Sequence, residues 1–325
     1  MLVNLFRKNY INQYLFILLI SILLWVGSFI APQPMAEYES FSYLYSLFYT
    51  LLSPFPLLAT ILAYIMVFTQ GLMFNQIFNR QNLIPNNTLL PMFLYVLFLS
   101  AVPIQNLNPI LFSNFFILLA INRLMDCTNT QNVQDKIFSA AILLSVASLF
   151  YIQSLYFILL LPLTLIIFKI YYWREWVTIL FGYAFPQIIL ILYAFFTDRL
   201  QIMLDSLKIY ITSMSLNIDT TNKIVLISNI FIILVFAVSF FVYLINTSES
   251  IVAYRKKASI ISWTFVICIV LSLYTFVIPL PIQICAIPFS FFISRYILKF
   301  KHKQTLIDIL FLLLVGALFV NVYLV

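Results

Sequence analysis

The sequence predicts an all-α integral membrane protein with about eleven transmembrane helices. Of its 325 residues, 64% are hydrophobic and 8% are charged, whereas soluble domains are roughly 45–50% apolar and about 25% charged. The apolar residues form continuous runs, without the alternating segments of a transmembrane β-barrel. Basic residues gather in short clusters at the ends of these runs. Residues 1–325 are therefore predicted to form a single polytopic domain.

The span count follows from the length of the apolar runs. A helix needs about 20 residues to cross the hydrocarbon core, and proline permits shorter spans. The first run is longer than the roughly 7–15 residues of a signal-peptide core, so we interpret it as a retained signal-anchor. The predicted spans are Tyr14–Ala31, Pro54–Phe74, Leu89–Pro103, Ile110–Met125, Ile137–Phe150, Leu155–Ile170, Trp176–Thr197, Ile224–Asn246, Ser259–Ile278, Ile282–Leu298 and Leu306–Leu324.

The basic residues predict the orientation, because Lys and Arg concentrate in cytoplasmic loops. With the N-terminus inside, 14 of the 17 basic residues fall on the inner side and 3 on the outer side. The prediction is N-in and C-out. The basic residues that give the net charge of +7 cluster at the ends of the spans, where they determine the orientation of the chain. We therefore expect no nucleic-acid partner. The outer three are Arg199, Lys208 and Lys223.

Two outer segments are long and polar enough to build a site, Ala31 to Ser53 and Asp198 to Lys223. In each, apolar residues recur at helical spacing with polar residues opposite, which predicts an amphipathic helix in the membrane interface. The stripes are Phe41, Leu44, Tyr45, Phe48, Leu51 and Leu52 in the first segment, and Leu200, Met203, Leu204, Leu207, Ile211 and Met214 in the second.

Glu37 and Glu39 are the candidate catalytic residues. In an extended chain they project to the same side and are able to act as general base and metal ligand. Alternatively, carboxylates at the start of an interfacial helix are stabilised by its dipole, and on residue types alone this explanation is the stronger. No metal and no other cofactor is assigned.

Arg199 and Lys208 are the candidate substrate-binding residues, because a cation can neutralise a donor phosphate. At about 100° per residue they lie on opposite sides of a helix, so both reach one phosphate only if the helix bends. The alternative for Lys208 is an ordinary helix pair with Asp205, three positions earlier.

The inner segment from Tyr171 to Trp176 combines aromatic and charged residues in a tight turn. Trp and Tyr favour the membrane interface and Arg favours the inner side, so we interpret this segment as an anchor and not as a ligand site. The basic runs Arg255 to Lys257 and Lys299 to Lys303 are able to bind anionic lipid, but topology alone accounts for them.

Several classes are excluded by missing residues. The single histidine, His302, cannot supply the cluster that a diiron or carotenoid-cleaving oxygenase needs. No charged residue lies near the middle of a span, which argues against proton-coupled transport, and there is no phosphate-binding glycine loop. Cys127, Cys268 and Cys285 show no metal or redox spacing, and we expect no disulfide. Among polar residues within spans, Gln187 beside Pro186 is notable, because proline frees a backbone carbonyl.

The chain resembles an uncharacterised family of polytopic membrane proteins of the Bacteroidota. The resemblance is carried by the stretch from Phe138 through Ser148-Leu149-Phe150-Tyr151 to Trp173-Arg174-Glu175-Trp176, and it extends along nearly the whole chain. The layout is also similar to the GT-C class of membrane glycosyltransferases, with a long acidic first outer loop and a second long outer loop after span 7. The loop from Ile104 to Pro109 departs from that class, since it has no acidic residue.

The GT-C resemblance implies that a carboxylate of the first outer loop, here Glu37 or Glu39, activates the acceptor or binds a metal. It also implies a polyprenyl-phosphate sugar donor in the outer leaflet of the inner membrane, for envelope glycan assembly. The alternative is a non-catalytic scaffold or lipid-handling component of the envelope, in which membrane lipid is the only expected ligand. A polar cavity at the two glutamates favours the enzyme, and a closed apolar bundle favours the scaffold.

Overall fold

The computed structural model describes residues 11–35, 43–84, 88–102, 104–128, 132–198, 200–201, 205, 223–246, 251–275, 282–299 and 304–323. Within these residues the chain is helical and contains no strand. The helices are α2 (Ile11–Ile30), α3 (Tyr43–Leu52), α4 (Pro56–Arg80), α5 (Leu90–Ser100), α6 (Pro109–Asp126), α7 (Val133–Phe150), η1 (Ile152–Leu159), α8 (Leu160–Phe168), α9 (Trp173–Phe196), α11 (Lys223–Asn246), α12 (Val252–Thr275), α13 (Ala286–Lys299) and α14 (Gln304–Tyr323).

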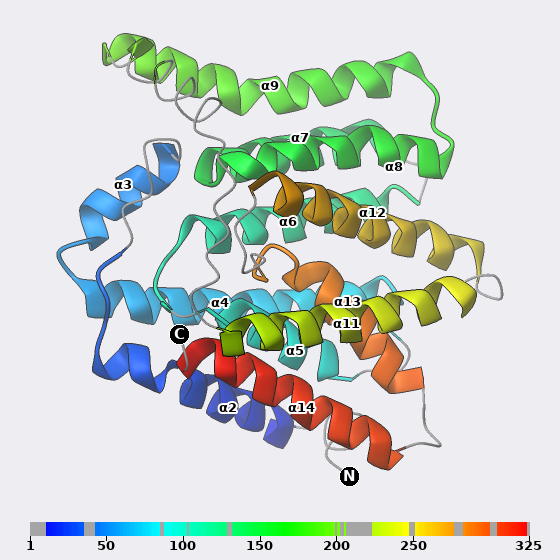
Figure 1. Ribbon diagram of the computed structural model, residues 1–325. Helices are drawn as coiled ribbons and strands as arrows, with labels where there is room; N and C mark the ends of the chain where they lie inside the picture. Colours follow the sequence, from blue (N-terminus) through cyan, green and yellow to red (C-terminus); the bar gives the residue numbers. More distant parts are fainter. Residues whose placement is uncertain are drawn as a thin grey trace.

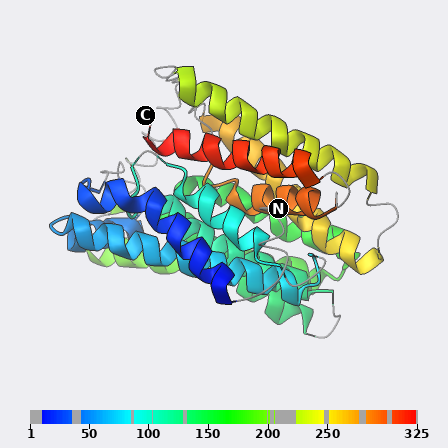
Figure 2. The same cartoon turned by 90° about the horizontal axis from the view of Figure 1, so that it is seen from below.

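The long helices run side by side along one direction (Figures 1 and 2). Helix α2 begins at one end of the bundle and α14 finishes at the opposite end (Figure 1). Seven helices in the described part of the chain are long and apolar enough to cross a membrane, namely α2, α4, α6, α7, α9, α11 and α14. This confirms a helical membrane protein of the multi-pass kind. The count of eleven spans and the orientation stay predictions.

The remaining predicted spans contain helices that are shorter, carry charged residues or are partly 3₁₀. Helix α12 has 24 residues, but Arg255, Lys256 and Lys257 occupy its first turns. Span Leu155–Ile170 is a 3₁₀ helix that continues as the 9-residue α8. Helices α5 and α13 have only 11 and 14 residues, or about 16 and 21 Å. Neither crosses a hydrocarbon core of about 30 Å alone.

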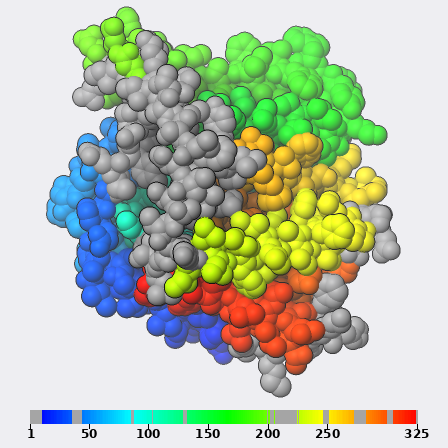
Figure 3. All heavy atoms as spheres, viewed as in Figure 1, coloured from blue at the N-terminus to red at the C-terminus, as the bar shows by residue number. Residues whose placement is uncertain are grey.

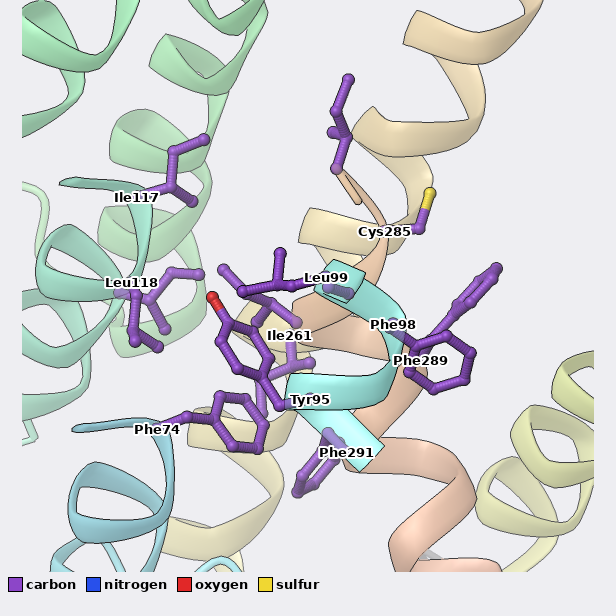
Figure 4. Packing of buried hydrophobic residues seen from close by; sticks show 14 of the residues in the cluster. Phe74, Tyr95, Phe98, Leu99, Ile117, Leu118, Ile261, Cys285, Phe289 and Phe291 are labelled. Atoms are coloured by element: carbon purple, nitrogen blue, oxygen red, sulfur yellow. The ribbon is translucent and has the colours of Figure 1, made fainter. Parts of the chain in front are cut away.

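Helices α5 and α13 are the centre of the bundle. All residues of α5 are buried, and α5 packs against α4 on one side and α13 on the other. Tyr95 stacks on Phe74 of α4 with ring centroids 4.6 Å apart, and Phe98 meets Phe289 of α13 edge-on at 5.6 Å. Figure 4 shows these rings on opposite sides of α5. Large aromatic side chains therefore fill the interior.

The lipid-facing surface is built from the outer faces of the peripheral helices. Helix α11 lies across the face of the molecule seen in Figure 3 and exposes Ile227, Leu234 and Phe241. Helix α9 packs mainly on α7 and exposes Phe181 and Phe196 on its free side. Helices of this length with exposed apolar side chains are typical of the lipid-contacting surface of a membrane protein.

Helix α9 contains a proline next to its polar contacts with α7. Pro186 lacks an N–H, so the carbonyl of Gly182 one turn earlier loses its helical donor. Ser145 Oγ of α7 donates to the carbonyl oxygen of Tyr183 at 2.7 Å. Gln187 Nε2 donates to Ser148 Oγ at 2.8 Å. The polar residue that stands out in the sequence beside Pro186 thus joins two helices.

Gly182 sets how closely α9 approaches α7. A Cβ there would lie 2.8 Å from Ala141 Cβ and 3.1 Å from the Phe138 carbonyl oxygen. We expect Gly182→Ala to separate the two helices and to lower the free energy of unfolding by about 1–3 kcal/mol. Gly316 of α14 is the matched control, because a Cβ at that position would meet nothing within 4 Å. Gly316→Ala should be neutral or stabilising by up to about 1 kcal/mol.

The measurement is unfolding of each purified variant in the same detergent micelles. A Gly182→Ala protein as stable as Gly316→Ala would contradict the close packing of α9 on α7.

Candidate functional site

The four residues that the sequence nominates for chemistry, Glu37, Glu39, Arg199 and Lys208, lie outside the described residues. Their immediate surroundings are described in part. The helix predicted in the first outer segment is present as α3, with Leu47 and Leu51 exposed. Residues on both sides of Glu37 and Glu39, up to Met35 and from Tyr43 onward, are described, and their contacts give the setting of the segment.

A non-helical platform, residues 101–102 and 104–108, follows α5 and leads to α6. Such backbone is tolerated inside a membrane protein only when its polar groups find partners. Gln105 Nε2 donates to the Ser100 carbonyl oxygen at 2.7 Å, and Ser28 Oγ donates to Gln105 Oε1 at 3.2 Å. Trp25 Nε1 of α2 donates to Ser100 Oγ at 2.9 Å. Helix α2 therefore fastens the start of the platform.

Asn108 ends the platform and begins α6. Its Oδ1 accepts from the Leu111 backbone N–H at 2.9 Å, which is the usual N-cap hydrogen bond. Its Nδ2 donates to Gln283 Oε1 at 3.0 Å. One amide side chain thus fixes the start of a helix and also holds the chain ahead of α13.

Gln283 ties the turn before α13 to the platform. Its Nε2 donates to the Leu99 carbonyl oxygen at 2.8 Å, and its own backbone carbonyl oxygen accepts from Asn114 Nδ2 at 2.6 Å. Gln283 and Asn114 are 3% and 1% exposed. Both ends of the Gln283 amide meet protein partners, so this side chain holds backbone together and is not free to bind a ligand.

A second buried pair continues the network toward the centre. Gln70 Nε2 of α4 donates to the Leu111 carbonyl oxygen at 2.9 Å, and Tyr95 OH of α5 donates to Gln70 Oε1 at 3.1 Å. Both side chains are fully buried. The network is neutral, which avoids the cost of burying charge.

The platform also holds segment 31–53, which the charge pattern predicts to be outer, at two points. Asn106 Nδ2 donates to the Pro34 carbonyl oxygen at 3.0 Å, and Tyr45 OH donates to the Leu107 carbonyl oxygen at 3.0 Å. Asn106 and Tyr45 are 4% and 2% exposed. The described residues on the two sides of Glu37 and Glu39 are therefore bound to adjacent residues of the platform.

A cluster of polar and charged residues joins the ends of α4 and α6 to α7 and α12 at the other end of the bundle. Gln81 Nε2 donates to Asp126 Oδ1 at 2.7 Å, and Lys136 Nζ donates to the Asp126 carbonyl oxygen at 2.9 Å. Lys257 Nζ donates to the Gln81 carbonyl oxygen at 3.4 Å. Burial lowers the pKa of Lys257, and the Asp126 carboxylate raises it by a smaller amount.

Arg295 of α13 reaches the same end of α4. Its Nη1 donates to the Leu83 carbonyl oxygen at 2.8 Å, and its guanidinium lies 4.5 Å from the centroid of the Tyr254 ring. Arg295 and Lys257 thus bind carbonyls just past the end of α4, where cations are favoured. This agrees with a structural role for these basic residues.

The segment from Tyr171 to Trp176 divides into two parts. Tyr171, Tyr172 and Trp173 are 67%, 73% and 70% exposed, as expected of an interfacial anchor. Glu175 is only 8% exposed, and its Oε2 has no hydrogen-bond partner in the described part of the chain. The aromatic and charged pattern of the turn predicts an anchor throughout and gives no sign that Glu175 turns inward.

The sequence does not predict the platform. The loop from Ile104 to Pro109 stands out because it has no acidic residue. The one further signal is its three amides, Gln105, Asn106 and Asn108, which belong to no recognised motif. No group of three metal-ligating side chains occurs among the described residues.

Comparisons with known proteins add no family and no function to this geometry. No protein-family model, no curated protein and no solved structure matches this chain.

Proposed function

We propose that this protein is a GT-C-like glycosyltransferase of the inner membrane that uses a polyprenyl-phosphate sugar in envelope glycan assembly. In this proposal Glu37 or Glu39 takes the proton of the acceptor hydroxyl, and Arg199 or Lys208 neutralises the donor phosphate. We also propose that the chain is a member of the uncharacterised Bacteroidota family that the stretch from Phe138 to Trp176 resembles.

The supporting observation is the double attachment of the first outer segment. Asn106 holds Pro34 and Tyr45 holds Leu107, both at 3.0 Å and both buried. A catalytic carboxylate needs a fixed position, and buried hydrogen bonds on both sides of it provide that.

The alternative is a non-catalytic scaffold or lipid-handling component of the envelope. The observation in its favour is that the buried amides of Asn108, Asn114 and Gln283 bind one another and backbone carbonyls. In that case the attachments at Asn106 and Tyr45 serve stability alone.

The experiment that separates the two is sugar transfer by the purified protein in nanodiscs. A set of radiolabelled polyprenyl-phosphate sugars is offered with envelope glycan acceptors, and the product is separated from the lipid donor. Transfer by the wild type that a Glu37→Gln, Glu39→Gln variant lacks supports the enzyme. Binding of the lipid donor without transfer, or neither, supports the scaffold.

Asn106 and Tyr45 should act as positioning residues for the glutamates. We expect Asn106→Leu or Tyr45→Phe to lower turnover by roughly 10–10²-fold, since a displacement of about 1 Å can cost that much. The change should appear mainly in kcat. Thr50→Val on α3 is the matched control, because Thr50 is exposed and its hydroxyl donates only to Leu47 of its own helix. Loss of folded protein in step with loss of turnover would show that the two side chains serve stability and not position.

A further inference from the structure

Two buried cysteines lie where α12 meets the start of α13. Cys268 is on α12, and Cys285 directly precedes α13. They are 2% and 1% exposed. Cys268 Sγ lies 3.6 Å from the carbonyl oxygen of Ile284, in the peptide group that leads into Cys285.

The 3.6 Å contact places the Cys268 thiol beside the residue that follows Ile284, which is Cys285. A carbonyl oxygen lies within about 3 Å of the Cα of the next residue because bond lengths fix that distance. Cys268 Sγ therefore lies near the Cα of Cys285. A disulfide requires the Cβ atoms of its two cysteines to lie about 3.5–4.5 Å apart. Figure 4 places Cys285 beyond Phe98 and Phe289, at the end of the aromatic cluster.

The third cysteine has a different setting. Cys127 follows α6 at the opposite end of the bundle, where its Sγ contacts the Arg123 carbonyl oxygen at 3.6 Å. Burial raises the pKa of Cys127 to about 12, which keeps it as the unreactive thiol. The predicted orientation puts Cys127 toward the reducing inner side and the turn before α13 toward the oxidising outer side.

We propose that Cys268 and Cys285 form a reversible intramolecular disulfide that fastens α12 to the turn carrying Gln283. Each thiol loses one proton and one electron, and the S–S bond forms between the two sulfurs. A lipid-soluble acceptor of the quinone class takes both electrons and both protons and becomes the quinol. The bond adds a covalent link to a turn that Gln283 already holds to Leu99. Its formation does not depend on glycosyl transfer.

The test counts free thiols in the folded protein. Membranes containing the wild type are treated with decylubiquinone, or with diamide as a second permeant oxidant, and are then denatured with a maleimide-polyethylene glycol tag. The reduced chain should take tags on all 3 of its cysteines. The oxidised chain should take one, on Cys127, and should recover the others after dithiothreitol. Mass spectrometry of the untagged digest should find the Cys268 and Cys285 peptides joined.

Variants sharpen the result. Cys127→Ser should take two tags when reduced and none when oxidised. Cys268→Ser and Cys268→Ala should keep both remaining tags under oxidant. Retention of three tags by the oxidised wild type overturns the proposal, and so does a covalent dimer on a non-reducing gel. The wild-type peptide map requires no substitution, so the proposal is decided even if a variant fails to fold.

Discussion

Replacement of Glu37 and Glu39 by glutamine is expected to lower turnover by about 10²–10⁴-fold, the usual contribution of a general base. Glutamine keeps the size and hydrogen-bonding shape of the side chain but cannot take a proton. Because the segment is held by Asn106 and Tyr45 on either side, the substitution should spare the fold.

The measurement is sugar transfer in nanodiscs, together with complementation of an envelope-glycan defect in a deletion strain at matched membrane level. Glu249→Gln, in a loop that the charge pattern places on the inner side, is the matched control and should be silent. If the double variant restores the wild-type glycan profile, the two carboxylates are only a helix start and the scaffold is the better account.

Replacement of Gln283 by leucine should produce the largest loss of stability among these variants. Leucine is similar in volume but removes the donor to the Leu99 carbonyl oxygen and the acceptor for Asn108 Nδ2. Each buried group left without a partner costs about 1–3 kcal/mol. We expect Gln283→Leu to lower the free energy of unfolding by roughly 2–5 kcal/mol.

The control is Gln201→Leu, since Gln201 is exposed and its replacement should change stability by less than about 0.5 kcal/mol. Both variants are unfolded by titration with a denaturing detergent. Equal midpoints for the two would mean that the Gln283 contacts do not hold the turn before α13 in place.

Hydropathy predicts the class of fold well because it reports directly on burial in lipid. Each predicted span contains helix, and a helix occurs where the stripe from Phe41 to Leu52 predicts one. The short lengths of α5 and α13 could not be predicted in this way. An apolar residue outside a helix, such as Val102 just after α5, has the same hydropathy as one in a helix, so Leu89–Pro103 looks like a continuous span.

The contacts that fix the outer segment could not be predicted from one sequence. Asn106 and Pro34 are 72 positions apart, and composition says which side chains are polar without saying which backbone carbonyl each one finds. The same holds for Cys268 and Cys285, whose spacing gives no redox signal although α12 and the turn before α13 bring them together. Glu175 is a third case, since its sequence neighbours predict an exposed turn and give no sign that its side chain is only 8% exposed.

The outer-face site rests on the orientation of the chain, and single-cysteine labelling tests it most directly. In a background with Cys127, Cys268 and Cys285 replaced by alanine, one cysteine is placed in turn at Glu39, Lys208, Arg174, Lys256 or Lys301. A membrane-impermeant maleimide should label the first two positions in intact cells and the last three only after permeabilisation. Labelling of Lys256→Cys in intact cells would contradict the orientation and would remove the outer-face site with it.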